Sequence, residues 1–152
     1  MTDERFVTTE AETEAAGAAL VAALPTAAVV LLSGTLGAGK TAFVRGMAAG
    51  LGIAPSDVSS PTFALIQEYR GGARPLIHID LYRLTPAEVD DLGLDEMVDA
   101  GGVVAVEWPD RWRYAPADAV RVQIDAPEAA LPGRRRIRIH GDRPSTGRYS
   151  ER

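Results

Sequence analysis

The sequence predicts a single α/β domain in which helices flank a central mixed sheet. Its 152 residues are enough for one domain with a sizeable core. The apolar, β-branched run AAVVLLS (27–33) is typical of a buried parallel strand, and a glycine-rich turn joins it to a helical segment at 41–51. Two alternating segments, 119–125 and 135–140, are expected to form a pair that closes the sheet.

Local signals predict the remaining elements. Thr9 and Glu12 fit a helix capping box, and the alanine-rich stretch after them predicts a first helix that ends before Pro25. Turn residues separate strands expected at 62–69, 75–81 and 103–108 and a short acidic helix expected at 86–92. We expect the domain to cover residues 1–141, with a polar, disordered tail at 142–152.

Composition excludes several classes of protein. The net charge of −5 argues against broad nucleic-acid binding, which needs a basic surface. There is no cysteine for a disulfide or a thiolate metal site, and no apolar run reaches membrane-spanning length. The first fifteen residues are polar and acidic, unlike a signal or transit peptide. A cytoplasmic protein is therefore expected.

The only lysine of the chain, Lys40, lies in GTLGAGKT (34–41). This segment matches the phosphate-loop pattern G-x-x-x-x-G-K-[ST] at every fixed position, between an expected strand and an expected helix, which is the context that the motif requires. A compact ammonium suits the β- and γ-phosphates of a nucleotide better than the planar fork of arginine. The sequence thus predicts a P-loop NTPase-like domain.

Each part of the loop has an expected role in holding ATP or ADP with Mg²⁺. Glycines 34, 37 and 39 permit backbone conformations that are closed to other residues, so that successive amides can point at phosphate oxygens. Lys40 is expected to neutralise the β- and γ-phosphates, and the Thr41 hydroxyl to bind the metal. The residues whose amides are expected to bind phosphate are Leu36, Gly37, Ala38, Gly39, Lys40 and Thr41.

Two expected strands end in an acid, LIHID at Asp80 and VVAVE at Glu107. Both carboxylates should emerge at the edge of the sheet where open α/β folds bind ligands. Either could hold the magnesium shell or orient the attacking water. Thr62, in the segment SSPT (59–62), could sense the γ-phosphate or could simply belong to a turn, and position alone does not separate these readings.

Other residues that could carry chemistry have plainer interpretations. His78 shares a strand face with Asp80, and we interpret it as a partly buried, hydrogen-bonded residue and not as a metal ligand. Trp108 could stack on a nucleotide base, although core packing is the commoner role of a single tryptophan. The arginines at 135, 136 and 138 are interpreted as the solvated face of an edge strand.

Nucleotide choice and protein class follow from what the chain lacks. The D-x-x-G at 90–93 lies in a helical segment, and a guanine-reading N-K-x-D is impossible because Lys40 is the only lysine. ATP is therefore favoured over GTP. A small-molecule kinase is the main enzymatic alternative, but no arginine-rich insertion follows Asp80. A nucleotide-switched binding module is the other alternative.

Four segments in order and spacing make the sequence resemble the TsaE family of small bacterial ATPases, which serve the pathway that places threonylcarbamoyl on adenosine 37 of tRNAs. They are GTLGAGKTAFVRG, SPTFALIQEY, HIDLYRL and VEWPDR, and the resemblance runs from about residue 9 to 141. The position after the first loop glycine, usually Asp or Asn in the family, is Thr35 here. That change alters a side chain and leaves the amides of the loop in place.

The resemblance implies roles for individual residues. Lys40, Asp80, Glu107 and Thr62 would be catalytic, with Thr62 as the switch threonine, Asp80 required for hydrolysis and Glu107 at the magnesium together with Thr41. Glu10, Thr13, Trp108 and Arg134 would lie at the nucleotide. The resemblance also implies ATP hydrolysis, action with the TsaD–TsaB heterodimer, and contact with tRNA only through that complex. Hydrolysis by the chain alone is expected to be slow, because no arginine-rich insertion supplies a finger over the γ-phosphate.

Overall fold

The computed structural model describes residues 2–25, 27–35, 39–54, 66–126 and 134–141. Within these residues seven strands form one sheet. In chain order the elements are β1 (Thr2–Val7), α1 (Glu10–Ala23), β2 (Ala28–Gly34), α2 (Lys40–Gly50), β3 (Ile66–Tyr69), β4 (Leu76–Asp80), α3 (Pro86–Asp90), α4 (Leu94–Asp99), β5 (Val103–Glu107), the 3₁₀ helix η2 (Pro109–Arg111), β6 (Val120–Asp125) and β7 (Arg135–His140).

The sheet is mixed, as the sequence predicts, with the strand order β1-β7-β6-β2-β5-β4-β3. Strands β6, β2, β5 and β4 are parallel neighbours, while β7, β1 and β3 each run antiparallel to the strand beside them. The carboxyl ends of the four parallel strands therefore share one edge of the sheet. That edge is where ligands bind in open α/β folds.

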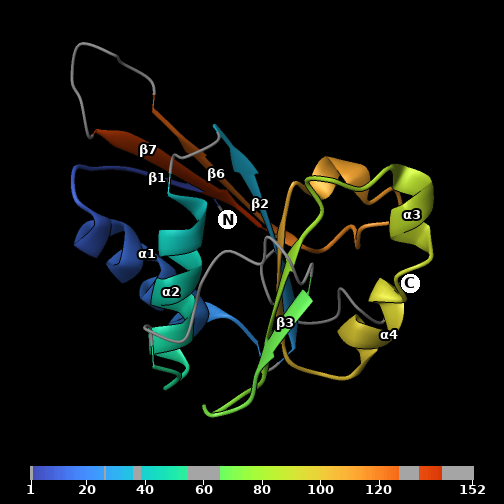
Figure 1. Cartoon of the computed structure of the whole chain (residues 1–152). Coiled ribbons are helices and arrows are strands. Elements are labelled where there is room, and N and C mark those ends of the chain that lie inside the picture. Colours follow the sequence, from blue (N-terminus) through green and yellow to red (C-terminus); the bar gives the residue numbers. More distant parts are fainter. Residues whose placement is uncertain (1, 26, 36–38, 55–65, 127–133, 142–152) are drawn as a thin grey trace.

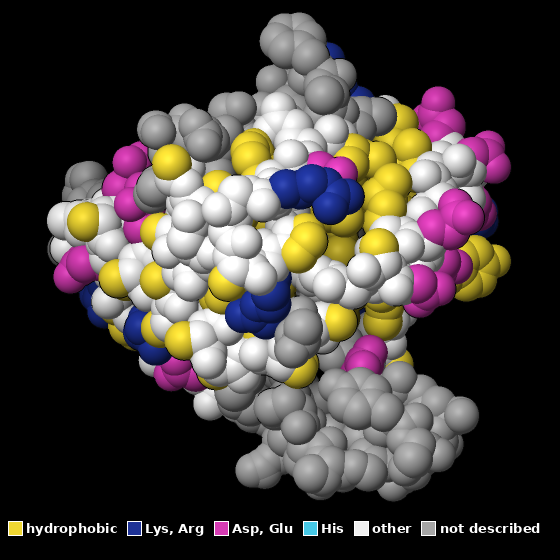
Figure 2. All heavy atoms as spheres, turned by 90° about the horizontal axis from the view of Figure 1, so that it is seen from below, with side chains coloured by type: hydrophobic (Ala, Val, Ile, Leu, Met, Phe, Trp, Pro, Cys, Tyr) yellow, Lys and Arg dark blue, Asp and Glu magenta, His cyan; other side chains and the backbone are white. Residues whose placement is uncertain are grey.

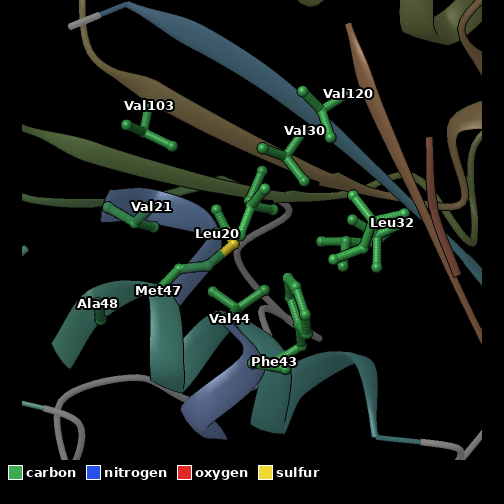
Figure 3. Packing of buried hydrophobic residues seen from close by; sticks show 14 of the residues in the cluster. Leu20, Val21, Val30, Leu32, Phe43, Val44, Met47, Ala48, Val103 and Val120 are labelled. Carbon is green, nitrogen blue, oxygen red and sulfur yellow. The ribbon is translucent and has the colours of Figure 1, made fainter. Parts of the chain in front are cut away.

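Helices cover both faces of the sheet (Figure 1): α1 and α2 lie on one face, and α3 and α4 lie on the other. Figure 3 shows how Phe43 and Met47 of α2 pack against Val30 and Leu32 of the sheet. Side chains on the opposite face of the sheet, among them Ile79 of β4, form the second core beneath α3 and α4. The alternation of strand side chains between the two faces thus places both cores.

Helices α1 and α2 approach each other closely because glycines lie at their contact. A Cβ atom on Gly46 would lie only 1.8 Å from the Glu14 carbonyl oxygen, and one on Gly17 would lie 2.2 Å from the Phe43 carbonyl oxygen. Any larger side chain would force the helices apart. This packing holds the start of α1 beside the start of α2, where the phosphate loop ends.

The expected elements are confirmed, with shifts of a few residues at their ends. The predicted helix at 86–92 ends at Asp90, and the strand predicted at 62–69 is described from Ile66 onward, with 62–65 outside the described residues. Three elements were not expected from the sequence, β1, α4 and the 3₁₀ helix η2. The predicted tail at 142–152 also lies outside the described residues.

The interpretation of the arginine-rich strand as a sheet edge is wrong. Strand β1 pairs with β7 along its whole length, so β7 is an inner strand and β1 is the edge. Instead of lying on an open edge, Arg136 and Arg138 reach the Asp125 carboxylate at 3.8 and 3.3 Å. Strand β1 has no alternating apolar pattern from which it could be predicted, because only Phe6 and Val7 in TDERFV are apolar.

None of the helices in the described part of the chain combines the length and the hydropathy needed to span a bilayer.

Candidate functional site

The phosphate-loop motif begins at the carboxyl end of β2, where the backbone requires glycine. Gly34 has a φ of 133°, and a Cβ atom there would lie 1.9 Å from the carbonyl oxygen of Ile124 in β6. The next amide, that of Thr35, donates a hydrogen bond to the same oxygen at 3.2 Å. The neighbouring strand therefore fixes the path of the chain where it leaves β2 and enters the loop. The loop ends at Gly39, which has a φ of 115° and precedes α2.

Lys40 is the first residue of α2, and its side chain is buried. Its Nζ donates to the carbonyl oxygens of Gly34 at 3.3 Å and of Thr35 at 3.1 Å. Burial lowers the pKa of Lys40, and the carboxylates of Glu107, Asp80 and Asp125 oppose that shift, in decreasing order. The single lysine thus lies within the field of three strand-end carboxylates.

The two predicted acids lie on neighbouring strands, side by side. Asp80 at the end of β4 and Glu107 at the end of β5 are partners in the register of that pair, and Glu107 is in turn opposite Leu32 of β2. Asp80 accepts a hydrogen bond from the Tyr82 amide at 2.9 Å. Burial raises the pKa of Asp80, and the neighbouring Glu107 adds to that rise, while the Tyr82 amide, His78 and Lys40 lower it.

His78 is fully buried, and its Nε2 lies 2.6 Å from Oε2 of Glu107. The expectation of a hydrogen-bonded strand histidine is confirmed, although its burial is complete and not partial. Asp80 and Glu107 share the sheet face with His78, because paired positions in register point to the same side. This is the face covered by α1 and α2.

Trp108 follows Glu107 in a left-handed conformation (φ 60°), the one described residue other than glycine with a positive φ. Its amide donates to the Leu32 carbonyl oxygen of β2 at 3.3 Å. The half-buried ring lies with its centre 5.0 Å from Lys40 Nζ and 4.8 Å from the centre of the Tyr82 ring. The side chain is therefore a partly exposed wall beside the lysine, and base stacking stays a prediction.

The residues present fit a magnesium ion held together with a nucleotide. Among the described residues, no group of three or more acidic, histidine or cysteine side chains forms a metal cage. A cage is not required, since Mg²⁺ in nucleotide sites takes one or two carboxylates, and phosphates and waters supply the rest. Asp80, Glu107 and the half-buried Thr41 hydroxyl in the first turn of α2 provide oxygen donors of that kind.

The other predicted nucleotide residues lie at the same edge or outside the described residues. A Cβ atom on Gly39 would lie 3.7 Å from the Thr13 methyl, so the start of α1, with exposed Glu10 as its first residue, borders the loop. Arg134 precedes β7 at this edge, and its guanidinium lies 4.1 Å from the centre of the Phe6 ring. The predicted Leu36, Gly37, Ala38 and Thr62 lie outside the described residues.

Sequence reasoning missed two residues and one contact at this site. Asp125 ends β6 just as Asp80 and Glu107 end their strands, and the run VRVQID carried the same signal. Tyr82 was passed over, although its ring packs on Trp108. The contact from His78 to Glu107 depends on the pairing of β4 with β5, which the separate segments do not reveal.

Comparison with known proteins places the chain in a family. The family model described as "Threonylcarbamoyl adenosine biosynthesis protein TsaE" matches residues 7–137. The chain belongs to the TsaE family. A TsaE protein of Aquifex aeolicus is 42% identical over 113 residues, covering 74% of this chain and 76% of that protein.

Other relatives agree with this assignment. A TsaE protein of Synechocystis is 44% identical over 105 residues, which are 66% of this chain and 66% of that relative. One of Bacillus subtilis is 54% identical over 80 residues, covering 53% of this chain and 49% of the relative. The chain therefore spans about two thirds or less of the length of these two relatives. The crystal structure of Bacillus subtilis YdiB matches with a TM-score of 0.74 at 34% identity, covering 93% of this chain and 86% of that one.

Proposed function

We propose that this TsaE-family chain binds Mg²⁺–ATP and hydrolyses it slowly, as the ATP-dependent component of tRNA threonylcarbamoyladenosine synthesis. The relatives carry that pathway in their names. One observation carries the nucleotide part of the proposal: the single lysine lies buried at the end of a phosphate-loop motif, in the field of Glu107 and Asp80. Few sites other than nucleotide sites combine these groups at the carboxyl edge of a parallel sheet.

We assign the roles of the side chains according to how close their strands lie to the phosphate loop. Lys40 would exchange its bonds to the Gly34 and Thr35 carbonyl oxygens for bonds to the β- and γ-phosphates. Glu107, on the strand next to β2, would hold the magnesium shell together with Thr41. When bound, the metal would neutralise charge that develops on the phosphates.

Asp80 lies one strand farther from the loop, which suits it to the attacking water. Its raised pKa makes this carboxylate a better proton acceptor than an ordinary aspartate. The Tyr82 amide fixes one of its oxygens and leaves the other for water. Thr62 would complete the site at the γ-phosphate, and Trp108, Arg134 and Glu10 would contact the rest of the nucleotide.

ATP is proposed over GTP because the chain has no second lysine for a guanine-reading motif. The D-x-x-G at 90–93 lies at the junction of α3 and α4, so it does not follow a strand as the GTPase motif would. The stretch between Asp80 and β5 holds only two short helices, which gives little support to a kinase with an arginine-bearing lid.

We propose that the chain acts through the TsaD–TsaB pair and meets tRNA only within that complex. Figure 2 shows acidic side chains gathered on the α3–α4 side of the molecule. The exposed acids there are Glu88, Asp90, Asp91, Asp95, Glu96 and Asp99. Such a surface repels phosphate backbones, in keeping with the net charge of −5. Cytoplasmic localisation stays a prediction.

Co-purification tests the proposal. Purified chain, tagged at its N-terminus, is incubated with the TsaD–TsaB pair in the presence and absence of Mg²⁺–ATP, with Lys40→Ala as the matched control. We expect wild-type capture to depend on nucleotide and the variant to lose that dependence. No capture of either partner under any nucleotide condition would reject the assignment of partners.

A further inference from the structure

We infer that His78 is a positioning residue that fixes the Glu107 carboxylate for the magnesium shell. The inference rests on the proposed function. The imidazole is fully buried on β4, and its Nε2 lies 2.6 Å from Oε2 of a carboxylate that is itself 5% exposed. Glu107 is thus held by a neighbouring strand as well as by its own backbone.

The sheet register makes this contact possible. His78 lies opposite Ala105, and Glu107 lies opposite Asp80 at the next position on the same face. The methyl group of Ala105 leaves space for the imidazole to lean along the sheet toward Glu107. Side chains in diagonal positions of neighbouring strands are within reach of an aromatic ring.

The hydrogen-bond partners of the two ring nitrogens indicate which of them carries the proton. Nδ1 of His78 is buried and has no hydrogen-bond partner among the described residues. A proton on Nδ1 would therefore be a buried donor without an acceptor, which is costly. The arrangement that leaves no buried proton without an acceptor therefore places the proton on Nε2, which donates to Oε2 of Glu107. One oxygen of Glu107 is then held, and the other is left for the metal shell.

Stability alone does not explain this pair. Apart from Asp80 at the end of β4, the other side chains on this face of β4 and β5 are apolar, namely Leu76, Val103 and Ala105. Well-packed hydrophobic residues often replace a buried polar pair at no loss of stability, or with a gain. Hydrogen bonds to ligating carboxylates, in contrast, typically contribute about 10- to 100-fold to metal affinity or activity.

A spectroscopic experiment tests the assigned form without nucleotide. The chain has two histidines, so long-range ¹H–¹⁵N NMR spectra of the wild type and of His140→Gln assign the signals of His78. We expect a proton on Nε2, the nitrogen that faces Glu107. A ring without a proton on Nε2 would overturn the inference.

Three variants test the function of the contact. His78→Leu keeps an apolar side chain of similar size, His78→Gln restores a donor near the Nε2 position, and Ile79→Val perturbs the opposite, buried face of the same strand. Affinity for ADP without metal, the magnesium dependence of ATP hydrolysis and the melting temperature are measured for each. We expect His78→Leu to need about 10- to 100-fold more magnesium or to hydrolyse that much more slowly. Metal-free ADP affinity should be retained, and His78→Gln should recover most of the loss.

The outcomes separate this inference from the proposed function. Normal magnesium dependence in His78→Leu, a loss in His78→Gln equal to that in His78→Leu, or an equal loss in Ile79→Val would each overturn the positioning role while leaving the proposed function in place. Absence of magnesium-dependent nucleotide binding by the wild type would reject the proposed function and this inference together.

Discussion

The ammonium group of Lys40 lies 5.0 Å from the centre of the Trp108 ring, so the sole lysine and a half-buried tryptophan contact each other beside the phosphate loop. The ring faces a cation that donates hydrogen bonds to the backbone carbonyl oxygens of Gly34 and Thr35 in the loop. Phosphate binding would draw the ammonium toward a new anion and change the environment of the ring.

Tryptophan emission should therefore report nucleotide binding. We expect addition of Mg²⁺–ADP to change the fluorescence of the wild type and to leave that of Trp108→Phe nearly unchanged. The second tryptophan, Trp112, is 6% exposed in the core below α3 and α4 and serves as the internal control. An equal change in Trp108→Phe would show that the signal arises elsewhere.

Lys40 and the two acids should differ in what they affect. Lys40→Ala should weaken Mg²⁺–ATP binding roughly 10- to 100-fold, the value of a charge-assisted hydrogen bond, and hydrolysis should fall with it. Asp80→Ala and Glu107→Ala should lower the hydrolysis rate about a hundredfold or more while affecting binding less, because the loop amides remain. Calorimetric titration and single-turnover hydrolysis measure the two quantities. Wild-type hydrolysis by both acid variants would refute the site assignment.

The Asp80 carboxylate should lower the free energy of unfolding of the nucleotide-free protein at neutral pH. Its pKa is raised in the folded state, so the folded chain binds this proton more tightly than the unfolded chain does. This tighter proton binding stabilises the folded state at acidic pH. The stabilisation is lost as the pH rises from the pKa of the unfolded chain through the pKa of the folded chain. Asp80→Asn, which can still accept from the Tyr82 amide, should melt at a higher temperature at pH 7. The difference should shrink toward about pH 4.

Melting curves at several pH values check this prediction, with the exposed Asp110→Asn as the control. A gain in Asp80→Asn that is the same at every pH would show that the pKa of Asp80 is not its origin.

Gly46, at the contact between α1 and α2, should be essential for the stability of the fold. In Gly46→Ala the added Cβ would overlap the Glu14 carbonyl oxygen, and such overpacking typically lowers the free energy of unfolding by about 1–3 kcal/mol or more. Gly71→Ala is the matched control, since a Cβ there would meet nothing within 4 Å. Chemical denaturation measures both variants. Equal stability of Gly46→Ala and wild type would contradict the close helix contact.

The elements with strong local signals were predictable from the sequence. The apolar run of β2, the loop glycines Gly34 and Gly39 and the capping box at Thr9 each depend on residues a few positions apart, and the structure confirms these three features. The acids at 80 and 107 were predictable because a strand ending in a carboxylate is visible in one segment.

Features that depend on pairing between distant segments were not predictable. Strand β1 is held by its ladder with β7 and not by an apolar face, so its composition gave no strand signal. The contact of His78 with Glu107 requires the register of β4 and β5, and the Lys40–Trp108 contact joins the first residue of α2 to the residue that follows β5. Long-range geometry of this kind is absent from local sequence patterns.

Steady-state ATP turnover tests the central claim most directly. It is measured for the chain alone, with the TsaD–TsaB pair added, and with a panel of small hydroxyl-bearing acceptors. We expect slow hydrolysis by the chain alone, because among the described residues no arginine-rich insertion lies over the loop, and an arginine finger is worth about a thousandfold or more. Addition of the pair should change the rate, and the acceptors should not. Phosphoryl transfer to a small acceptor without any protein partner would contradict the proposed function and indicate a kinase.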